Sequence, residues 1–220
     1  MQYLVNPSSN PYNTFMKVTS IILAGGKNTR LGKNKALEII GGKTVIERVI
    51  ERLRPVSNQL LIVTSSETNH FPGAGDAEIL TDLYPGYGPL GGIYTGLVKA
   101  RSRYSLAVAC DMPFLNTELL KYMIEQAHGV DVVVPCLDGG MIESLHSIYS
   151  SGCLPSVKAC LDKKQLSIER CIRPLNVRYV AQTETQAIDP RMLSFFNINY
   201  PSDLEKANAI ATEETVHKGI

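Results

Sequence analysis

Apolar positions along most of the chain follow two alternating patterns. Short continuous runs rich in Val, Ile and Leu predict buried strands, whereas apolar residues that recur every three or four positions predict amphipathic helices. The runs cover 17–23, 60–63, 77–80, 104–110 and 130–135, and the helical patterns cover 45–53, 90–100 and 117–128. Because strands separated by helices pair in parallel, we predict an α/β three-layer sandwich: a mostly parallel sheet with helices on both faces.

The pattern is less regular after residue 140. We expect further strands at 145–149 and 177–180, antiparallel at an edge of the sheet, and a last strand at 195–198 followed by a helix. No repeat or linker divides residues 16–220, which we interpret as a single domain. Residues 1–15 are polar and contain two Asn-Pro pairs, so we expect a loose leader ahead of Met16.

Composition excludes several classes of partner. The 220 residues include 22 basic and 21 acidic side chains, and a net charge of +1 gives no overall attraction to nucleic acid or to an acidic membrane. No run approaches the roughly 20 apolar residues that span a bilayer. The five cysteines form no CxxC pair and predict neither a zinc site nor a disulfide framework, which favours a reducing, cytoplasmic location.

The loop after the first predicted strand carries the strongest chemical signal. Its sequence, LAGGKNTRLGKNK at 23–35, contains three glycines and the cations Arg30 and Lys35. Successive main-chain N–H groups in such a loop form a concave anion site, and the cations can reach different phosphates. The loop therefore predicts phosphate binding, with a plain strand-to-helix connection as the alternative.

Two aspartates also follow predicted strands. Asp111 comes directly after the run at 104–110, and Asp82 lies at the end of the strand predicted from the run at 77–80. A carboxylate beside a buried strand is costly unless it is paired, hydrated or metal-bound, and Mg²⁺ prefers one or two carboxylates together with phosphate oxygens. We therefore expect Asp111 to bind Mg²⁺ and Asp82 to face the same crevice; the alternatives are a helix cap and a turn aspartate, respectively.

Two other motifs compete with this interpretation. Gly42-Lys43-Thr44 resembles the end of a P-loop, but Leu37 occupies the place of the required glycine, and a Thr44–Glu47 capping box explains the segment better. The sequence GYGPLG at 86–91 fits G-x-G-x-x-G, so a dinucleotide-binding oxidoreductase is an alternative. Pro89 speaks against that alternative because it has no N–H to give a pyrophosphate.

The loop at 23–35 matches the pattern L-A-G-G-x-x-x-R-x-G-x-x-K of nucleotidyltransferases with a Rossmann-like fold. Three further segments resemble one branch of them, the molybdenum cofactor guanylyltransferases (MobA): GPLGGI at 88–93, ACDMPF at 109–114 and FFNINYPSDL at 195–204. The resemblance extends from about residue 17 to 209. It implies transfer of GMP from GTP to molybdenum-bearing molybdopterin, with Mg²⁺ as cofactor and with molybdoenzymes or their chaperones as transient partners.

The resemblance, together with the loop chemistry, assigns site residues. Catalytic roles fall to Arg30, Lys35 and Asp111, with Asp111 as the metal ligand. Substrate-binding roles fall to Leu23, Ala24, Gly25, Gly26, Lys35, Asp82, Asp111, Asn197 and Asn199. The family often has an Asn that reads guanine after the second strand, where this chain has Thr64-Ser65-Ser66. A nucleotidyltransferase that uses CTP or a sugar phosphate therefore stays an alternative, as does a non-catalytic nucleotide-binding protein.

Other polar side chains receive weaker assignments. His146 is interpreted as a half-buried strand residue, with a pterin contact as the alternative. The anionic pterin needs cations of its own, and candidates are Lys163, Lys164, Arg170 and Arg173, for which a solvated helix face is the alternative.

Overall fold

A seven-stranded sheet forms the centre of the computed structural model, which describes residues 16–25, 35–65 and 70–217. Its strands are β1 (Val18–Leu23), β4 (Ser57–Thr64), β5 (Glu78–Thr81), β6 (Tyr104–Ala109), β7 (Val132–Cys136), β8 (His146–Ser150) and β9 (Val177–Ala181). They lie in the order β5-β4-β1-β6-β8-β7-β9, and all but β8 run in one direction. The prediction of a mostly parallel sheet is confirmed. The expected leader, residues 1–15, lies outside the described residues.

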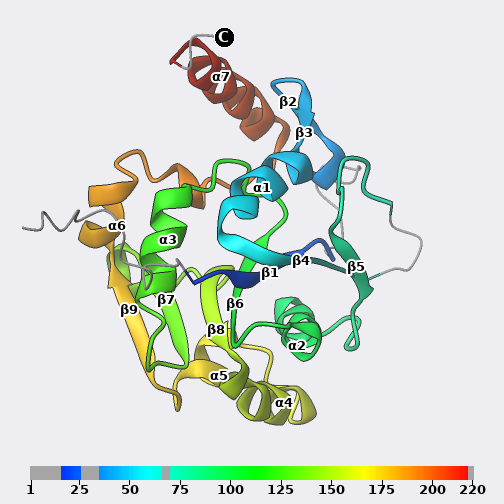
Figure 1. Ribbon diagram of the computed structural model, residues 1–220, viewed down its shortest axis with the longest axis vertical. Coiled ribbons are helices and arrows are strands. Elements are labelled where there is room, and N and C mark those ends of the chain that lie inside the picture. The colour runs from blue at the N-terminus through cyan, green and yellow to red at the C-terminus, as the bar shows by residue number, and fades with distance from the viewer. Residues whose placement is uncertain (1–15, 26–34, 66–69, 218–220) are drawn as a thin grey trace, which may run out of the picture.

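Helices cover both faces of this sheet (Figure 1). They are α1 (Val45–Leu53), α2 (Pro89–Lys99), α3 (Thr117–Glu125), α4 (Leu154–Asp162), α5 (Ile168–Ile172), α6 (Gln182–Ile188) and α7 (Pro201–His217). In the view of Figure 1, α1, α3 and α6 lie on one side of the sheet, and α2, α4 and α5 on the other. Short strands β2 (Ile39–Ile40) and β3 (Lys43–Thr44) pair as a hairpin near α7.

The core has two main layers because successive side chains of a strand point to opposite faces. Ile21 and Ile22 of β1 are both fully buried, yet Ile22 packs in one hydrophobic cluster with α1 and α3, whereas Ile21 packs in the other with α2 and α4. Burial on both faces explains why these strands appear in the sequence as continuous apolar runs. The predicted capping box is also present: Glu47 N donates to Thr44 Oγ1, and Thr44 N donates to Glu47 Oε2.

Two predictions for the second half of the chain are wrong. β8 is antiparallel, as expected, but lies between β6 and β7 in the interior of the sheet, and the edge strand β9 is parallel to its neighbour. The segment 195–198 is not a strand: a 3₁₀ turn covers Leu193–Phe195, and Ile198 N donates to the carbonyl of Asp111 beyond the end of β6. The apolar run reflects burial of this irregular segment, since Ile198 is fully buried.

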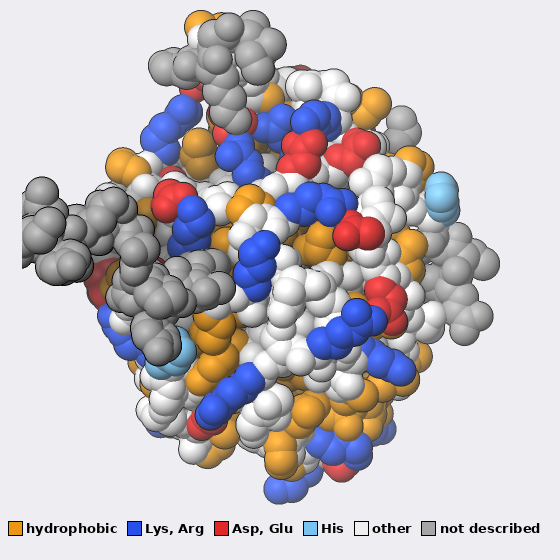
Figure 2. All heavy atoms as spheres, in the orientation of Figure 1, with side chains coloured by type: hydrophobic (Ala, Val, Ile, Leu, Met, Phe, Trp, Pro, Cys, Tyr) orange, Lys and Arg blue, Asp and Glu red, His pale blue; other side chains and the backbone are white. Residues whose placement is uncertain are grey.

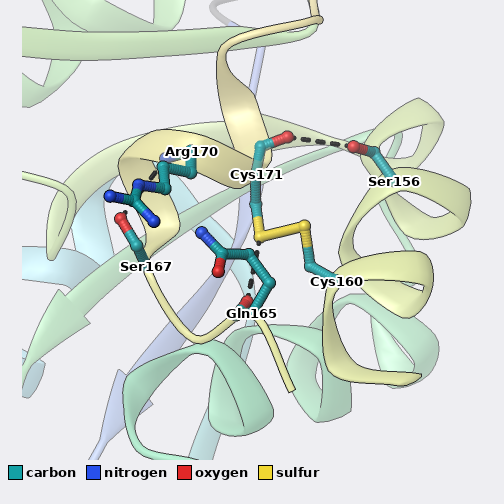
Figure 3. The surroundings of a disulfide bond; sticks show 6 residues. All are labelled: Ser156, Cys160, Gln165, Ser167, Arg170 and Cys171. Atoms are coloured by element: carbon teal, nitrogen blue, oxygen red, sulfur yellow. Dashed lines mark hydrogen bonds between the residues drawn. A yellow bond between two sulfur atoms is a disulfide. The ribbon is translucent and has the colours of Figure 1, made fainter. Parts of the chain in front are cut away.

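A disulfide joins Cys160 of α4 to Cys171 of α5 (Figure 3). The expectation that the cysteines form no disulfide is therefore wrong for this pair, whereas Cys110, Cys136 and Cys153 are free. Spacing along the chain gives no signal for the bond, because the two cysteines meet only through the packing of α4 on α5.

Charge is dispersed over the face of the molecule that Figure 2 draws. On the face drawn in Figure 2, Lys and Arg side chains are scattered and interspersed with Asp and Glu. Within the described residues, no helix is both long enough and apolar enough to cross a membrane.

Candidate active site

A cavity of about 440 Å³ opens at the carboxyl ends of β1 and β6. The connections from these neighbouring strands lead to opposite halves of the sheet, and such a switch point is where open α/β sheets bind ligands. Seven of the predicted site residues line this cavity: Leu23, Ala24, Gly25, Lys35, Asp111, Asn197 and Asn199. The structure thus brings together residues from the two ends of the domain.

Lys35, Asp111 and Asn199 form the polar centre of the cavity. Lys35 Nζ donates to Asn199 Oδ1 over 2.9 Å and lies 3.5 Å from Asp111 Oδ2. The Lys35 and Asp111 side chains are 18% and 19% exposed. Burial raises the pKa of the Asp111 carboxyl, and the nearby ammonium of Lys35 only partly offsets this effect. A second cation at Asp111 would therefore be favourable.

The main chain fixes Asp111 from two directions. Cys110 N donates to Leu23 O, which ties the end of β6 to β1, and Ile198 N donates to Asp111 O over 3.1 Å. Because Ile198 points into the core, its neighbours Asn197 and Asn199 are left at the cavity wall. Asn199 N in turn donates to Asp203 Oδ2 in the first turn of α7.

The start of the glycine loop runs close to β4. Ala24 N donates to Val63 O, and a Cβ at Gly25 would lie 3.1 Å from Ser65 N. The absence of a side chain at Gly25 thus lets the main chain approach this strand end. Gly26 and Arg30 lie outside the described residues, so their assigned roles stay predictions.

Asp82 is not at the polar centre. Its Oδ1 accepts from Tyr84 N and from Thr95 Oγ1, each over 2.9 Å, so the residue closes a turn, as the alternative interpretation held. It also lines a smaller cavity with Thr64 of β4, and this cavity shares Leu23 and Gly25 with the larger one. Asp82 and Asp111 therefore lie on different sides of the glycine loop's first residues.

The G-x-G-x-x-G match does not form a dinucleotide loop. Gly88 is the N-cap of α2, Pro89 is its first residue, and Gly91 lies inside the helix. The motif also begins at Gly86, beyond the end of β5 at Thr81. This segment instead supplies Pro89 to the wall of the cavity.

Sequence reasoning missed one carboxylate of the cavity, Glu143, which lines it together with Ser144 and Leu145. A strand at 145–149 running antiparallel to β6 must begin at the edge where β6 ends, and that signal could have placed Glu143 here. His146, the first residue of β8, is fully buried rather than half-buried as predicted, and burial lowers its pKa to about 4. It lies outside the cavity wall, as do the exposed Lys163, Lys164, Arg170 and Arg173.

The donor set suits a metal that takes most of its ligands from its substrate. Among the described residues, no group of three or more His, Cys, Asp or Glu side chains could hold a metal by itself. Mg²⁺ is commonly bound through one or two carboxylates together with phosphate oxygens and water, and Asp111 offers one such carboxylate. These residues therefore fit Mg²⁺ that arrives with a nucleotide.

Comparison with known proteins identifies the family of the chain. Residues 20–179 match the family model of the MobA-like NTP transferase domain. The chain is 36% identical over 196 residues to a probable molybdenum cofactor guanylyltransferase of Pelotomaculum thermopropionicum, covering 89% of this chain and 94% of the relative. It is 37% identical over 194 residues to the molybdenum cofactor guanylyltransferase of Desulfosudis oleivorans, covering 87% and 95%.

Solved structures with a similar fold include nucleotidyltransferases. Molybdopterin-guanine dinucleotide biosynthesis protein A from Archaeoglobus fulgidus superposes with a TM-score of 0.77 at 28% identity, covering 89% of this chain and 99% of that one. A 2-C-methyl-D-erythritol 4-phosphate cytidylyltransferase from Thermus thermophilus has a TM-score of 0.67 at 20% identity, over 90% of this chain and all of that one, and shares the fold. The family match covers most of the chain, and the relatives are similar over nearly their whole length: this chain belongs to the MobA-like NTP transferase family.

Proposed function

We propose that the protein is a molybdenum cofactor guanylyltransferase, which transfers GMP from GTP to molybdenum-bearing molybdopterin and releases pyrophosphate. The observation that carries the proposal is the cluster of Lys35, Asp111 and Asn199 in a cavity at the switch point of the sheet. The names of the relatives from Pelotomaculum thermopropionicum and Desulfosudis oleivorans support guanine as the base and molybdopterin as the acceptor.

The reaction needs positioning and charge neutralisation rather than a side-chain nucleophile. A terminal phosphate oxygen of the pterin forms a bond to the α-phosphorus of GTP. The bond from that phosphorus to the oxygen bridging to the β-phosphate breaks, and its electron pair leaves with pyrophosphate. The attacking oxygen already carries negative charge, so no strong general base is required.

Different residues of the chain would position the nucleotide, neutralise the phosphates and bind the metal. The main chain at Leu23–Gly25 approaches the nucleotide, and the ammonium of Lys35, oriented by Asn199, neutralises phosphate charge. Asp111 would hold Mg²⁺, which would supply further positive charge to neutralise the phosphates. Gly26 and Arg30 would extend the phosphate cradle. Thr64 and Asp82 lie on the side of β4 and β5, where we place the nucleoside.

The alternative within the family is a nucleotidyltransferase that uses CTP. The two are separated by measuring pyrophosphate release by the purified protein with molybdenum-loaded molybdopterin, Mg²⁺ and either nucleotide. We expect kcat/KM for GTP to exceed that for CTP by at least about tenfold, about 1.4 kcal/mol. Equal or better use of CTP would assign the chain to the cytidylyl reaction, and no release with either would indicate a binding protein. Transfer of the product to molybdoenzymes and a cytoplasmic location stay predictions.

A further inference from the structure

One carboxylate of the cavity has no part in the reaction described so far. Glu143 lies in the cavity wall just before β8, and its side chain is partly buried. Burial raises the pKa of its carboxyl, and no cation or hydrogen-bond donor among the described residues offsets that effect. A partly buried carboxylate is stabilised by water or by a hydrogen-bond donor, so that of Glu143 is available to a ligand that enters the cavity.

The main chain of Glu143 is firmly held, in contrast to its side chain. Glu143 N donates to Pro135 O over 3.0 Å, while the Glu143 carbonyl accepts from His146 N over 3.1 Å and from Ser147 Oγ over 2.6 Å. These bonds join the start of β8 to β7 without the carboxylate. The fold therefore places Glu143 at the cavity wall, and no hydrogen bond or ion pair among the described residues uses its carboxylate.

Position along the sheet edge separates Glu143 from the nucleotide side. The sheet order places β5, β4 and β1 on one side of β6, and β8 on the other. Thr64 and Asp82 belong to the first side, Asp111 follows β6, and Glu143 precedes β8. A nucleotide with its base toward β4 and its phosphates at Lys35 and Asp111 leaves Glu143 facing the second substrate.

The chemistry of a carboxylate limits what it can recognise there. An ionised carboxylate only accepts hydrogen bonds and repels phosphate, so its partners are N–H or O–H groups. We propose that Glu143 is a specificity-determining residue that accepts hydrogen bonds from N–H groups of the pterin ring system of the acceptor. The inference rests on the proposed function. Guanine carries a similar 2-amino-oxo-pyrimidine edge, and the position of Glu143 on the β8 side assigns it to the pterin rather than to GTP.

The experiment compares the wild-type protein with Glu143→Ala, Glu143→Gln and the control Glu205→Ala, which removes an exposed carboxylate on α7. KM is measured separately for molybdenum-loaded molybdopterin and for GTP. Binding of 7,8-dihydropterin, which carries no phosphate, is followed by fluorescence without turnover. We expect Glu143→Ala to raise KM for molybdopterin at least about tenfold and to weaken dihydropterin binding, with KM for GTP within about twofold. Glu143→Gln keeps one accepting oxygen, so its KM for molybdopterin should lie between those of the wild type and Glu143→Ala.

Two outcomes of the KM measurements would contradict the inference. A rise in KM for GTP alone would mean that Glu143 reads guanine, and unchanged constants for both substrates would mean that it binds neither. Melting temperatures close to wild type show that the variants fold, as expected from the main-chain anchoring of Glu143. If the wild-type protein releases no pyrophosphate, the proposed function fails, whereas dihydropterin binding by wild type and Glu143→Ala still tests Glu143 itself.

Discussion

The main-chain N–H of Ile198 donates to the carbonyl of Asp111 over 3.1 Å, and this bond joins the end of β6 to the segment before α7. Ile198 is fully buried, so its flanking residues Asn197 and Asn199 face the cavity, and Asn199 Oδ1 accepts from Lys35 Nζ. The candidate site thus depends on contacts between parts of the chain that are far apart in sequence. Lys35 is held where phosphates would arrive in the proposed reaction, and the proposed metal ligand, Asp111, lies 3.5 Å from its ammonium.

Replacing Lys35 by Ala should weaken both GTP binding and turnover. In the proposed reaction its ammonium contacts phosphates before and during the transfer, so the loss should affect the ground state as well as the transition state. We expect at least about a tenfold rise in the Kd for GTP, measured by calorimetry, and a larger fall in kcat/KM. The matched control is Lys163→Ala, which removes an exposed lysine outside the cavity. Unchanged GTP affinity in Lys35→Ala would show that this ammonium does not touch the nucleotide.

Gly96 lets α2 lie directly on β1. A Cβ at this position would come within 2.5 Å of Cγ2 of Ile21, which is fully buried and cannot move aside. Gly→Ala at an unobstructed helix site stabilises by about 1 kcal/mol, but overpacking here should cost about 1–3 kcal/mol instead. Urea unfolding of Gly96→Ala measures the sign of the change in the free energy of unfolding, and Val98→Ala on the exposed face of α2 is the control. A more stable Gly96→Ala would mean that α2 is not packed on Ile21 as described.

His146 should make the protein sensitive to acid. Its ring is fully buried, neither ring nitrogen has a hydrogen-bond partner among the described residues, and burial lowers its pKa to about 4 from 6.5. Because the unfolded chain binds the proton more tightly, the contribution of this group to the free energy of unfolding is present above pH 6.5 and is lost as the pH falls toward 4. The loss should amount to at most about 3 kcal/mol.

Urea unfolding at pH 7 and pH 4.5 tests this dependence. His146→Leu removes the titrating group and should flatten the change between the two pH values, without loss of stability at pH 7, because two unpartnered nitrogens leave the core. Replacing the exposed His70 by Leu should leave the change as in wild type. An equally steep change in His146→Leu would assign the acid sensitivity to other groups.

The disulfide between Cys160 and Cys171 should stabilise the fold without affecting catalysis. The bond closes a loop with a sequence separation of 11. Because it restricts the unfolded chain, a loop of this length should raise the free energy of unfolding by about 2–3 kcal/mol. Neither cysteine lines the cavity, so kcat should not change at temperatures where the protein stays folded. Unfolding with and without dithiothreitol measures this stabilisation. Cys160→Ser should lose the stabilisation, whereas Cys136→Ser, which removes a free thiol, should keep it. Identical curves for oxidised and reduced wild type would contradict the prediction.

The sequence predicts the parallel part of the fold well because its central strands β1, β4 and β6 are buried on both faces. The apolar runs that contain Ile21, Leu61 and Leu106 leave little choice of structure. Prediction fails for the place of β8, because the apolar pattern of one strand does not show whether it lies at the edge of the sheet or between two other strands. It also fails at 195–198, where the burial of Ile198 imitates a strand although its N–H bonds to Asp111.

The site was predictable where a loop follows a strand. Lys35 and Asp111 each follow a predicted strand, and motif likeness added Asn197 and Asn199. Glu143 was missed because it precedes a strand, and only the reversed direction of β8 brings it to the cavity. The disulfide was missed because the meeting of Cys160 with Cys171 depends on helix packing, which no local pattern encodes.

The central claim, guanylyl transfer centred on Asp111, is tested most directly by one labelling experiment. Wild type and Asp111→Asn, which keeps the shape but loses the charge, are incubated with α-phosphate-labelled GTP, molybdenum-loaded molybdopterin and increasing Mg²⁺. Wild type should move the label into the pterin product in a Mg²⁺-dependent reaction. Asp111→Asn should lower kcat at least about a hundredfold, about 2.7 kcal/mol, while metal-free GTP binding changes little. A near-normal Mg²⁺-dependent rate in Asp111→Asn, or no label in the pterin with wild type, would contradict the account.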